Sequence, residues 1–275
     1  MKPFLKWAGN KYQIVNRIKE QLPGGKRLIE PFVGSGAVFV NTAYDAYLLA
    51  DANGDLIQLY RHLQAEGNDF IAYAQQFFVL ENNTKEQFYN FRTEFNTTAD
   101  SRYKSALFIY LNKHCFNGLC RYNQKGEYNV PFGRYKKPYF PEKEMQFFHR
   151  HAQNAEFRHA DFATVMAAAE PGDVIYCDPP YDPLSETANF TSYSAGGFGV
   201  AEQQELAQQA MACAKRGIPV VISNHDTEFV REEYAGARIE AFDVQRYISC
   251  NGSNRGKAAE LLAVFAVTDI REQPV

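Results

Sequence analysis

The sequence KRLIEPFVGSGAVF, residues 26–39, joins a short apolar run to a glycine-rich turn. An apolar run bounded by turn residues is typical of a buried strand, and glycines allow the backbone to approach a ligand closely. After the turn we expect a helix over residues 34–44, a second strand over 46–51 and a second helix over 53–64. Strands that alternate with helices in this way predict a parallel sheet with helical crossovers.

The periodicity of apolar residues predicts further elements on either side of this sequence. Strand patterns resume near residue 155 and end in two apolar runs, ARIEAFDV and ELLAVFAV, which predict an antiparallel hairpin at one end of the sheet. Further helices are expected over residues 10–22, 84–96 and 101–113.

The length of the chain predicts one domain with a large insertion. A chain of 275 residues is long for one compact unit and short for two. We expect residues 1–57 and 151–275 to form an α/β domain. Residues 58–150, where the strand–helix alternation stops, would form a mostly helical insertion.

The composition is that of a globular protein and disfavours several classes. The residues are 45% hydrophobic and 22% charged, which allows a sizeable core. Because the chain lacks both a membrane-spanning apolar run and the apolar core of a signal peptide, we expect a cytoplasmic protein. The five cysteines are odd in number and lack zinc-ligand spacing, so we predict neither a disulfide framework nor a metal site. A formal net charge of −3 means that any nucleic-acid binding must depend on how the charge is distributed.

Polar features at the ends of the first two predicted strands favour a nucleoside ligand. Gly34 and Gly36 form the turn after the first strand, and Asp51 ends the second. Ligands of open α/β sheets bind outside the carboxyl ends of the strands, where Asp51 could accept both hydroxyls of a ribose. Phe39 stands where a dinucleotide fingerprint has its third glycine, so a nucleoside with a carboxylate, held at the helix N-terminus, fits better than a pyrophosphate. Taken alone, the structural alternative is a tight turn followed by an aspartate that caps a helix.

The sequence VIYCDPPYDP, residues 174–183, ends a third predicted strand with an acid, two prolines and an aromatic ring. The exocyclic amine of a nucleobase is a poor nucleophile, because its lone pair is delocalised into the ring. The carboxylate of Asp178 and the carbonyl of Pro179 could hold its two N–H groups and direct the lone pair at the methyl group of S-adenosylmethionine. Pro180 stiffens the backbone that presents this carbonyl, and Tyr181 could stack on the base. An ordinary turn capped by an exposed tyrosine is the structural alternative.

These motifs and several others resemble those of the Dam family of DNA adenine-N6 methyltransferases. The similar stretches span nearly the whole chain: FLKWAGNK, EPFVGSG, LLAD, NGLCRYN, NVPFGRYKKPYF, YCDPPY and ISNHDT. Their order resembles the alpha group of amino methyltransferases, whose insertion recognises DNA. The resemblance implies a Rossmann-like sheet that binds S-adenosylmethionine and needs no metal. It also implies methyl transfer to N6 of an adenine flipped out of double-stranded DNA, within the palindrome GATC.

The resemblance also implies which residues form the cofactor site and the catalytic site. The catalytic positions are Asp178, Pro179, Pro180 and Tyr181. The cofactor-binding positions are Trp7, Lys11, Glu30, Pro31, Phe32, Gly34, Gly36, Asp51, Phe162 and Asp178. One departure is Asn10, where the family commonly has a second glycine, and a non-glycine residue would be strained there if the backbone needs a positive φ.

The insertion carries the positive charge that the chain as a whole lacks. Residues 112–143 hold seven basic residues against two acidic ones, a net charge of +5 within a chain of −3. Aromatic residues are interleaved with them, which favours a recognition loop over a solvated loop above a small aromatic core. The expected DNA contacts are Lys6, Phe116, Asn117, Leu119, Arg121, Asn123, Pro131, Arg134, Tyr135, Lys136, Lys137, Asn251 and Arg255.

The resemblance assigns base-reading positions within this set, and the remaining basic and polar residues are expected to contact the DNA backbone. Arg121, Leu119 and Pro131 match base-reading positions, and the guanidinium fork of Arg121 suits O6 and N7 of guanine. Phe116 and Asn117 match residues that enter the duplex when the adenine flips, although the family often has tyrosine at position 116. Contacts to phosphate are expected from Arg134, Lys136, Lys137, Asn251, Ser253 and Arg255.

Other reactions fit the same residues. The amine clamp would also serve N4 of cytosine or a protein glutamine, and a DNA-binding module without catalysis could carry the same insertion. Chemistry at C5 of cytosine would need a nucleophilic cysteine after a proline, and the sequence has no Pro-Cys pair. We expect a monomeric enzyme encoded by a bacterium or a phage. It could mark DNA for mismatch repair and replication or protect it in restriction–modification.

Overall fold

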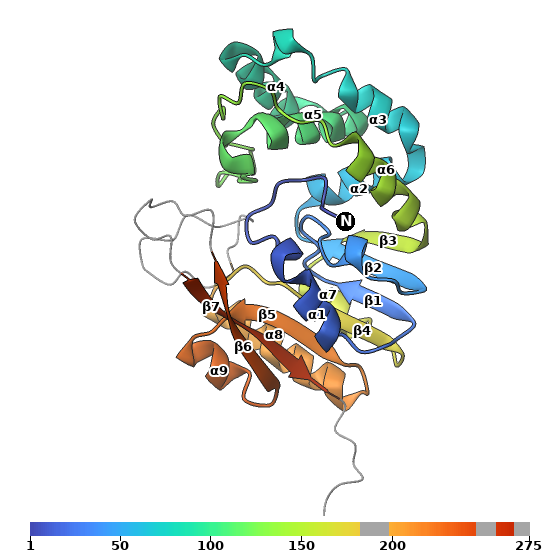
Figure 1. The fold of residues 1–275 in the computed structure, drawn as a ribbon, viewed down its shortest axis with the longest axis vertical. Coiled ribbons are helices and arrows are strands. Elements are labelled where there is room, and N and C mark those ends of the chain that lie inside the picture. Colours follow the sequence, from blue (N-terminus) through green and yellow to red (C-terminus); the bar gives the residue numbers. More distant parts are fainter. Residues whose placement is uncertain (182–197, 246–256, 267–275) are drawn as a thin grey trace, which may run out of the picture.

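The computed structural model of the chain describes residues 1–181, 198–245 and 257–266. Its centre is a seven-stranded sheet with the order β3-β2-β1-β4-β5-β7-β6 (Figure 1). Strands β1 to β5 pair in parallel, and β7 is antiparallel to both β5 and β6. The strands are β1 (Arg27–Glu30), β2 (Ala46–Asp51), β3 (Ala155–His159), β4 (Asp173–Cys177), β5 (Val220–His225), β6 (Arg238–Gln245) and β7 (Lys257–Phe265). The expected parallel sheet with an antiparallel C-terminal hairpin is confirmed.

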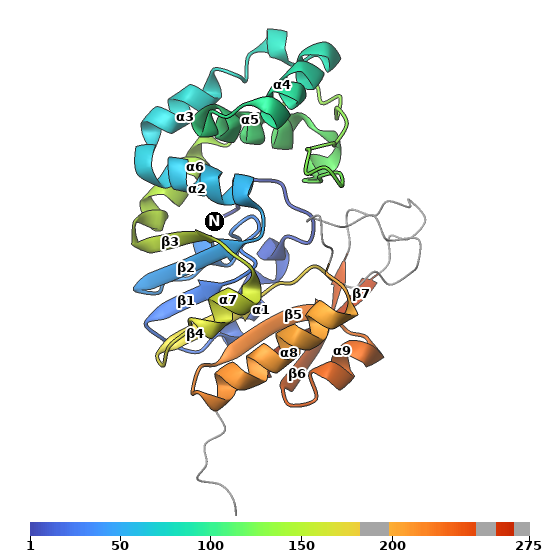
Figure 2. The ribbon, with the colours of Figure 1, turned by 180° about the vertical axis from the view of Figure 1, so that it is seen from behind.

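Both faces of the sheet are covered, because successive residues of a strand point to opposite sides. On β4, Val174 and Tyr176 belong to one hydrophobic cluster, whereas Ile175 and Cys177 belong to the other. Figure 2 shows the second face, which is covered by α7 (Phe162–Ala167), α8 (Val200–Lys215) and α9 (Glu228–Glu233). On the first face lie the short helix η1 (Lys11–Ile14) and α1 (Val15–Gln21), which divide the helix expected over residues 10–22.

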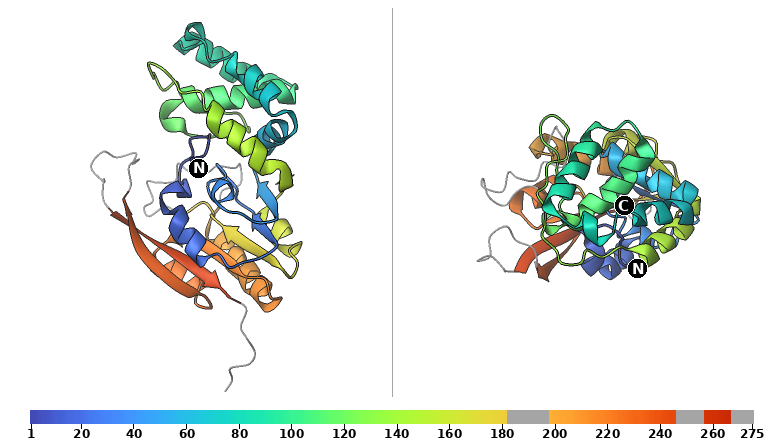
Figure 3. Two further views of the ribbon diagram at one scale, coloured as in Figure 1. Left: turned by 45° about the vertical axis from the view of Figure 1, so that its right-hand side comes forward. Right: turned by 90° about the horizontal axis from the view of Figure 1, so that it is seen from above.

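A group of helices lies beyond the β3 edge of the sheet, opposite the hairpin of β6 and β7 (Figure 3). It contains α3 (Asn68–Gln75), α4 (Lys85–Thr97) and α5 (Ser101–His114), and it is joined to the sheet by α2 (Gly54–Glu66) and α6 (Glu142–His151). Helices α4 and α5 confirm those expected over residues 84–96 and 101–113. The expected boundary after residue 57 falls inside α2, so a continuous helix leads from the sheet into the helical group.

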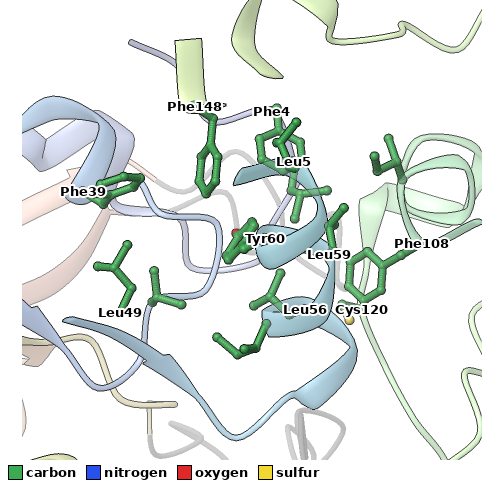
Figure 4. Packing of buried hydrophobic residues seen from close by; sticks show 14 of the residues in the cluster. Phe4, Leu5, Phe39, Leu49, Leu56, Leu59, Tyr60, Phe108, Cys120 and Phe148 are labelled. Atoms are coloured by element: carbon green, nitrogen blue, oxygen red, sulfur yellow. The ribbon is translucent and has the colours of Figure 1, made fainter. Parts of the chain in front are cut away.

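One hydrophobic cluster connects this helical group to the sheet (Figure 4). Tyr60 of α2 lies at its centre, with its ring centroid 4.8 Å from that of Phe148 and 5.9 Å from that of Phe4. Phe108 of α5 and Cys120 belong to the same cluster on the side of the helical group. Full burial of one large apolar side chain is worth about 1.5–3 kcal/mol. Continuous packing therefore fixes the helical group relative to the strand ends.

The helix expected over residues 34–44 is wrong. Only a three-residue 3-10 helix, η2 (Phe39–Asn41), forms in this stretch. Gly34 and Gly36 both have positive φ, 47° and 71°, and the chain turns at each instead of continuing as a helix. The turn after β1 therefore lacks the long helix whose N-terminus was expected to hold an anionic group.

Candidate active site

The expected residues come together at the carboxyl ends of the neighbouring strands β1, β2 and β4. Strand β1 lies between β2 and β4, so the glycine turn after β1 adjoins both Asp51 and Asp178. The N–H of Gly34 donates to Oδ2 of Asp51 over 3.0 Å, and the N–H of Asn53 donates to Oδ1 over 2.9 Å. The glycine turn and the strand-end acid thus form one unit.

The N-terminal segment packs on this turn. A Cβ atom at Gly34 would lie 2.9 Å from Nε1 of Trp7, so the indole approaches as closely as a glycine allows. Asn10 adopts φ −51° and ψ 125°, which suits any residue. Its side chain accepts from the N–H of Tyr12 over 2.7 Å and donates to Oγ of Ser35 over 3.0 Å. The strain considered for a non-glycine residue at this position does not arise.

Lys11 connects the N-terminal segment to Asp178 and Tyr181. Its ammonium lies 3.1 Å from Oδ1 of Asp178 and 4.2 Å from the ring centroid of Tyr181, and it donates to the carbonyl of Gly9 over 2.9 Å. The side chain of Lys11 is 6% exposed, whereas that of Asp178 is 23% exposed. Burial raises the pKa of Asp178, and the charge of Lys11 opposes that rise. Asp178 is therefore held in place while part of it stays open to a ligand.

Ser223 and Tyr176 complete the surroundings of Asp178. Both lie in stretches that resemble the family, but the sequence assigned neither a role. The hydroxyl of Ser223, which is fully buried, donates to Oδ1 of Asp178 over 3.0 Å and lies 2.9 Å from the hydroxyl of Tyr176. The ring of His225 lies edge-on to Tyr181, with 4.4 Å between centroids. Ser223 and His225 lie in β5, which is separated along the chain from Asp178 and Tyr181 by a helical crossover. Only the pairing of β4 with β5 therefore reveals these contacts.

Three phenylalanines cluster beside the glycine turn. Phe32 stacks on Phe162, with centroids 5.4 Å and planes 26° apart. Phe198, which precedes α8 and was not expected, lies 5.5 Å from Phe32 and 5.7 Å from Phe162. The cluster offers flat apolar surface, which suits a heteroaromatic ring.

Glu30 places a buried carboxyl group at the end of β1, next to Pro31, which is also buried. Its Oε1 has no hydrogen-bond partner among the described residues. Burial raises its pKa well above the ordinary value, and the charge of Asp178 adds to the rise. A buried oxygen without a partner is costly to the fold, so its presence beside the glycine turn indicates a ligand group that pairs with it.

The expected DNA contacts gather around the turn that follows α5. Phe116, Asn117 and Gly118 form the short helix η4 (Phe116–Gly118), in which Asn117 has φ 54°, an uncommon conformation for a residue other than glycine. Phe116 is 50% exposed, and Asn117 is exposed as well. The turn thus presents an aromatic ring and an amide to solvent on a constrained backbone.

Lys6 lies against this turn although the chain between them is long. A Cβ atom at Gly118 would lie 2.3 Å from Cβ of Lys6, and the Lys6 ammonium lies 4.1 Å from the ring centroid of Tyr135. Asn112 of α5, which is buried, binds the Lys6 backbone twice. It accepts from the N–H over 2.9 Å and donates to the carbonyl over 2.8 Å. Asn112 was missed because an asparagine within a helix gives no sign of its distant partner.

The base-reading positions expected from the sequence lie in the segment 119–131. Asn129 orients the guanidinium of Arg121, which donates through Nε to Oδ1 over 2.8 Å and through Nη2 to the backbone carbonyl over 3.2 Å. Leu119 is half-buried, and Pro131 is exposed. The side chain of Asn123 bonds to Glu127 and to backbone N–H groups of its own turn. The guanidinium of Arg121 is therefore fixed by Asn129, while the side chain of Asn123 stabilises the turn in which it lies.

The expected phosphate contacts follow in the next loop. Arg134, Lys136 and Lys137 are exposed, and Arg134 has a positive φ of 56°. Asn83 donates to the carbonyls of Tyr135 and Lys136 over 2.9 and 3.2 Å and so attaches the loop to the helical group. Asn251, Ser253 and Arg255 lie outside the described residues.

Neither a metal site nor a membrane span is found in the described part of the chain. No group of three or more His, Cys, Asp or Glu residues there could hold a metal ion. Within the same residues, no helix is long and apolar enough to cross a membrane. Four cysteines, Cys115, Cys120, Cys177 and Cys213, are buried free thiols.

Comparison with known proteins gives consistent matches over nearly the whole chain. The model of a family described as D12 class N6 adenine-specific DNA methyltransferase matches residues 7–248. A protein of Serratia marcescens named DNA adenine methylase is 52% identical over 263 residues, which cover 95% of this chain and 97% of that protein. Proteins of the same name from Escherichia coli (strain K12) and Vibrio cholerae serotype O1 are 51% and 52% identical. They cover 95% of this chain, which spans 94% and 95% of their lengths.

Proposed function

The chain belongs to the D12 class of N6 adenine-specific DNA methyltransferases, and we propose that it methylates adenine within GATC, with S-adenosylmethionine as the methyl donor. Methyl transfer to N6 of adenine in DNA is the activity of the family. One observation carries the finer proposal: motifs that are far apart in the sequence meet in the fold, at the strand ends and at the turn after α5. Lys11 contacts Asp178 at the strand ends, and Lys6 contacts the turn that bears Phe116.

The residues at the strand ends fit each part of S-adenosylmethionine, which would supply an electrophilic methyl group on a sulfonium. The carboxylate of Asp51 suits the ribose hydroxyls, and the stacked pair of Phe32 and Phe162 suits the adenine ring. The unpaired Oε1 of Glu30 suits the ammonium group of the methionine part. The remaining members of the proposed cofactor site are Trp7, Lys11, Pro31, Gly34, Gly36 and Asp178. The reaction needs no metal.

The residues after β4 are proposed to hold the adenine amine. Asp178 and the carbonyl of Pro179 accept its two N–H groups and so aim the nitrogen lone pair. Lys11 and Ser223 both contact Oδ1 of Asp178, which fixes the orientation of the carboxylate. Tyr181 stacks on the base. Asp178 need not be a strong base at the outset, because the nitrogen loses its proton readily once it carries the methyl group.

Double-stranded DNA is proposed to bind across the helical group and the strand ends. An adenine must leave the duplex before it can react, and the exposed ring of Phe116 is proposed to fill the space that it leaves. Residues 58–150 would form the recognition domain, and residues 1–57 and 151–275 the catalytic domain. We propose that the enzyme acts as a monomer in a bacterial cytoplasm, where its DNA substrate lies.

Methylation of defined duplexes tests this proposal. Purified protein and S-adenosylmethionine are incubated with a GATC duplex and with duplexes that change one or two bases of the site, and the modified nucleosides are identified by mass spectrometry. We expect N6-methyladenine, formed at least about 30-fold faster in GATC than in a duplex with two changed bases, at about 1–3 kcal/mol for each base. Equal methylation of all adenines would reject GATC. N4-methylcytosine as the main product would reject adenine as the target.

A further inference from the structure

We propose that Gln203 of α8 is a positioning residue for the catalytic turn, Asp178–Tyr181, which it holds through the carbonyl of Pro180. The proposal rests on the proposed function of this turn as an amine clamp. Nε2 of Gln203 donates to the carbonyl of Pro180 over 3.1 Å, and the residue is only 1% exposed. Gln203 belongs to α8 on the second face of the sheet, whereas Lys11 belongs to η1 on the first, so we expect Gln203 to act on the turn and not on the substrate.

The catalytic turn is held from both faces of the sheet by consecutive residues of β5. Ser223 and Asn224 point to opposite faces, because successive strand residues alternate. On one face Ser223 donates to Asp178 over 3.0 Å. On the other face Asn224 donates to Oε1 of Gln203 over 3.1 Å, and Gln203 in turn donates to Pro180. One strand end thus fixes both the acid and the second proline of the turn.

The chemistry of the position calls for an amide. Oε1 of Gln203 accepts from Asn224 and from the hydroxyl of Tyr234, over 3.1 and 3.3 Å, while Nε2 must donate to Pro180. A carboxylate would lack the donor, and a lysine or arginine would lack the acceptor. Asn224 is fully buried and Tyr234 nearly so, so a wrong group at position 203 would leave buried polar atoms unpaired.

The bond to Pro180 matters for the geometry of the clamp. A proline has no N–H, so its carbonyl is the one backbone group through which it can be hydrogen-bonded. That carbonyl lies in the planar peptide unit that joins Pro180 to Tyr181, so Gln203 fixes the plane from which the Tyr181 ring projects. A displacement of about 1 Å in a reacting group can cost about 100-fold in rate. Gln203 is therefore expected to affect the rate of methyl transfer more than the binding of DNA or cofactor.

The sequence of α8 does not show which of its glutamines has this role, but it does provide a control. Helix α8 contains four glutamines, Gln203, Gln204, Gln208 and Gln209, of which only Gln203 is buried. Gln208 is exposed on the same helix. A change at Gln208 alters the same residue type in the same helix without touching the catalytic turn.

The test compares Gln203→Met with Tyr234→Phe and the control Gln208→Met. Methionine has a similar shape to glutamine but offers neither a donor to Pro180 nor an acceptor to Asn224 and Tyr234. Tyr234→Phe removes a partner of Oε1 and of Asn224 but leaves the bond to Pro180 in place, so it measures the contribution of the wider network. kcat and KM are measured from N6-methyladenine formed in chromosomal DNA of a bacterium that lacks adenine methylation. Such DNA contains every short sequence, so an error in the proposed GATC site would not affect the result, and the wild-type reaction shows whether S-adenosylmethionine is the donor.

We expect Gln203→Met to lower kcat about 10-fold or more while the KM values for DNA and cofactor change less than about twofold. Tyr234→Phe should lower kcat less than about threefold, and Gln208→Met should match the wild type. A wild-type kcat for Gln203→Met would overturn the proposal. So would a loss in Tyr234→Phe as large as in Gln203→Met, since the wider network and not Pro180 would then be responsible. A rise in KM with unchanged kcat would also overturn it.

Gln203→Glu provides a second variant in case Gln203→Met does not fold. Its side chain has the same shape and still accepts from Asn224 and Tyr234, but its carboxylate presents no donor to Pro180. Assayed at about pH 10, above the pKa of about 8–9 that burial can give a glutamate, it should show the same fall in kcat at unchanged KM. A kcat equal to that of the wild type at this pH would overturn the proposal.

Discussion

The catalytic turn (Asp178–Tyr181) and the recognition segment (116–137) are built in opposite ways. Around the catalytic turn, Lys11, Ser223 and Gln203 are buried, and the polar group of each binds the turn itself. In the recognition segment, most of the basic and aromatic side chains expected to contact DNA are exposed or half-buried. Aligning an amine requires fixed dipoles, whereas contact with a duplex requires groups that are accessible until the DNA arrives. The difference in burial fits the difference between the two proposed tasks.

Both regions nevertheless share one device, an amide side chain that binds the backbone of a loop. Gln203 holds the carbonyl of Pro180. In the helical group, Asn112 holds Lys6, and Asn96 of α4 accepts from the N–H of Tyr128 over 2.8 Å and donates to its carbonyl over 3.1 Å. An amide can donate and accept at once. It can therefore supply a loop with the backbone hydrogen bonds that a neighbouring strand would otherwise provide. The exposed segment is thus accessible without being unconstrained.

The largest expected effect separates chemistry from DNA binding. Asp178→Ala removes one of the two acceptors in the amine clamp, and the loss of a positioned acceptor costs about 100- to 1000-fold in rate. DNA affinity should change little, because the recognition segment is untouched. Single-turnover methyl transfer and fluorescence anisotropy with a labelled duplex measure the two quantities. A single-turnover rate near that of the wild type would remove Asp178 from the clamp.

A second prediction concerns the stability of the helical group at acid pH. His114 is buried at the end of α5, where its Nδ1–H donates to the carbonyl of Tyr110 over 2.8 Å. Burial lowers the pKa of His114 to about 4. The pKa of a histidine in the unfolded chain is about 6.5. At pH values between about 6.5 and about 4, His114 therefore binds a proton in the unfolded chain but not in the folded chain. Stability is therefore lost as the pH falls through this range, by at most about 3 kcal/mol.

The variant His114→Phe tests the contribution of this group. It keeps a ring against Tyr110 but cannot titrate, so the free energy of unfolding should fall less between pH 7 and about pH 4.5 than it does in the wild type. Urea unfolding at the two pH values gives the comparison, since every other titrating group is common to both proteins. An identical fall in wild type and variant would show that His114 does not contribute to the acid sensitivity.

The third prediction tests whether Arg121 reads sequence. Asn129 already orients its guanidinium, and a bidentate contact to guanine contributes about 1–3 kcal/mol of discrimination. Arg121→Ala should therefore lower kcat/KM on GATC by about 10- to 100-fold and lose discrimination at one guanine. The measurement is kcat/KM on GATC and on each single-base variant. If the variant loses activity equally on every site, Arg121 contacts only the backbone of the DNA.

The sequence predicted the elements that depend on local pattern and missed the contacts that depend on pairing. The buried run before Gly34 and the DPPY sequence after β4 were identified from periodicity and residue type. The helix over residues 34–44 was wrong, because the apolar pattern does not show that Gly34 and Gly36 both take positive φ. No role was assigned to Ser223 or Gln203, because their contacts exist only once β5 and α8 lie beside the catalytic turn.

The smallest expected effect is that of Lys136, an exposed lysine that shares its loop with other expected DNA contacts. A lysine at a phosphate binds as a point charge and carries no sequence information. Lys136→Ala should therefore weaken binding to GATC and to unrelated duplexes by the same factor. It should also reduce the slope of log K against log salt by about one unit, because one phosphate contact releases about 0.9 counterion.

Lys19→Ala is the matched control for this change, since Lys19 is an exposed lysine of α1 and the substitution alters the net charge equally. Affinities for GATC and for an unrelated duplex, each measured at three or more salt concentrations, give the slopes. The control should keep the wild-type slope. A loss in Lys136→Ala confined to GATC would make this lysine a base reader, and the exposed loop would then share the task of sequence reading with Arg121. An unchanged slope in Lys136→Ala would place the lysine away from the phosphates, and the backbone contacts of this loop would have to come from Arg134 and Lys137.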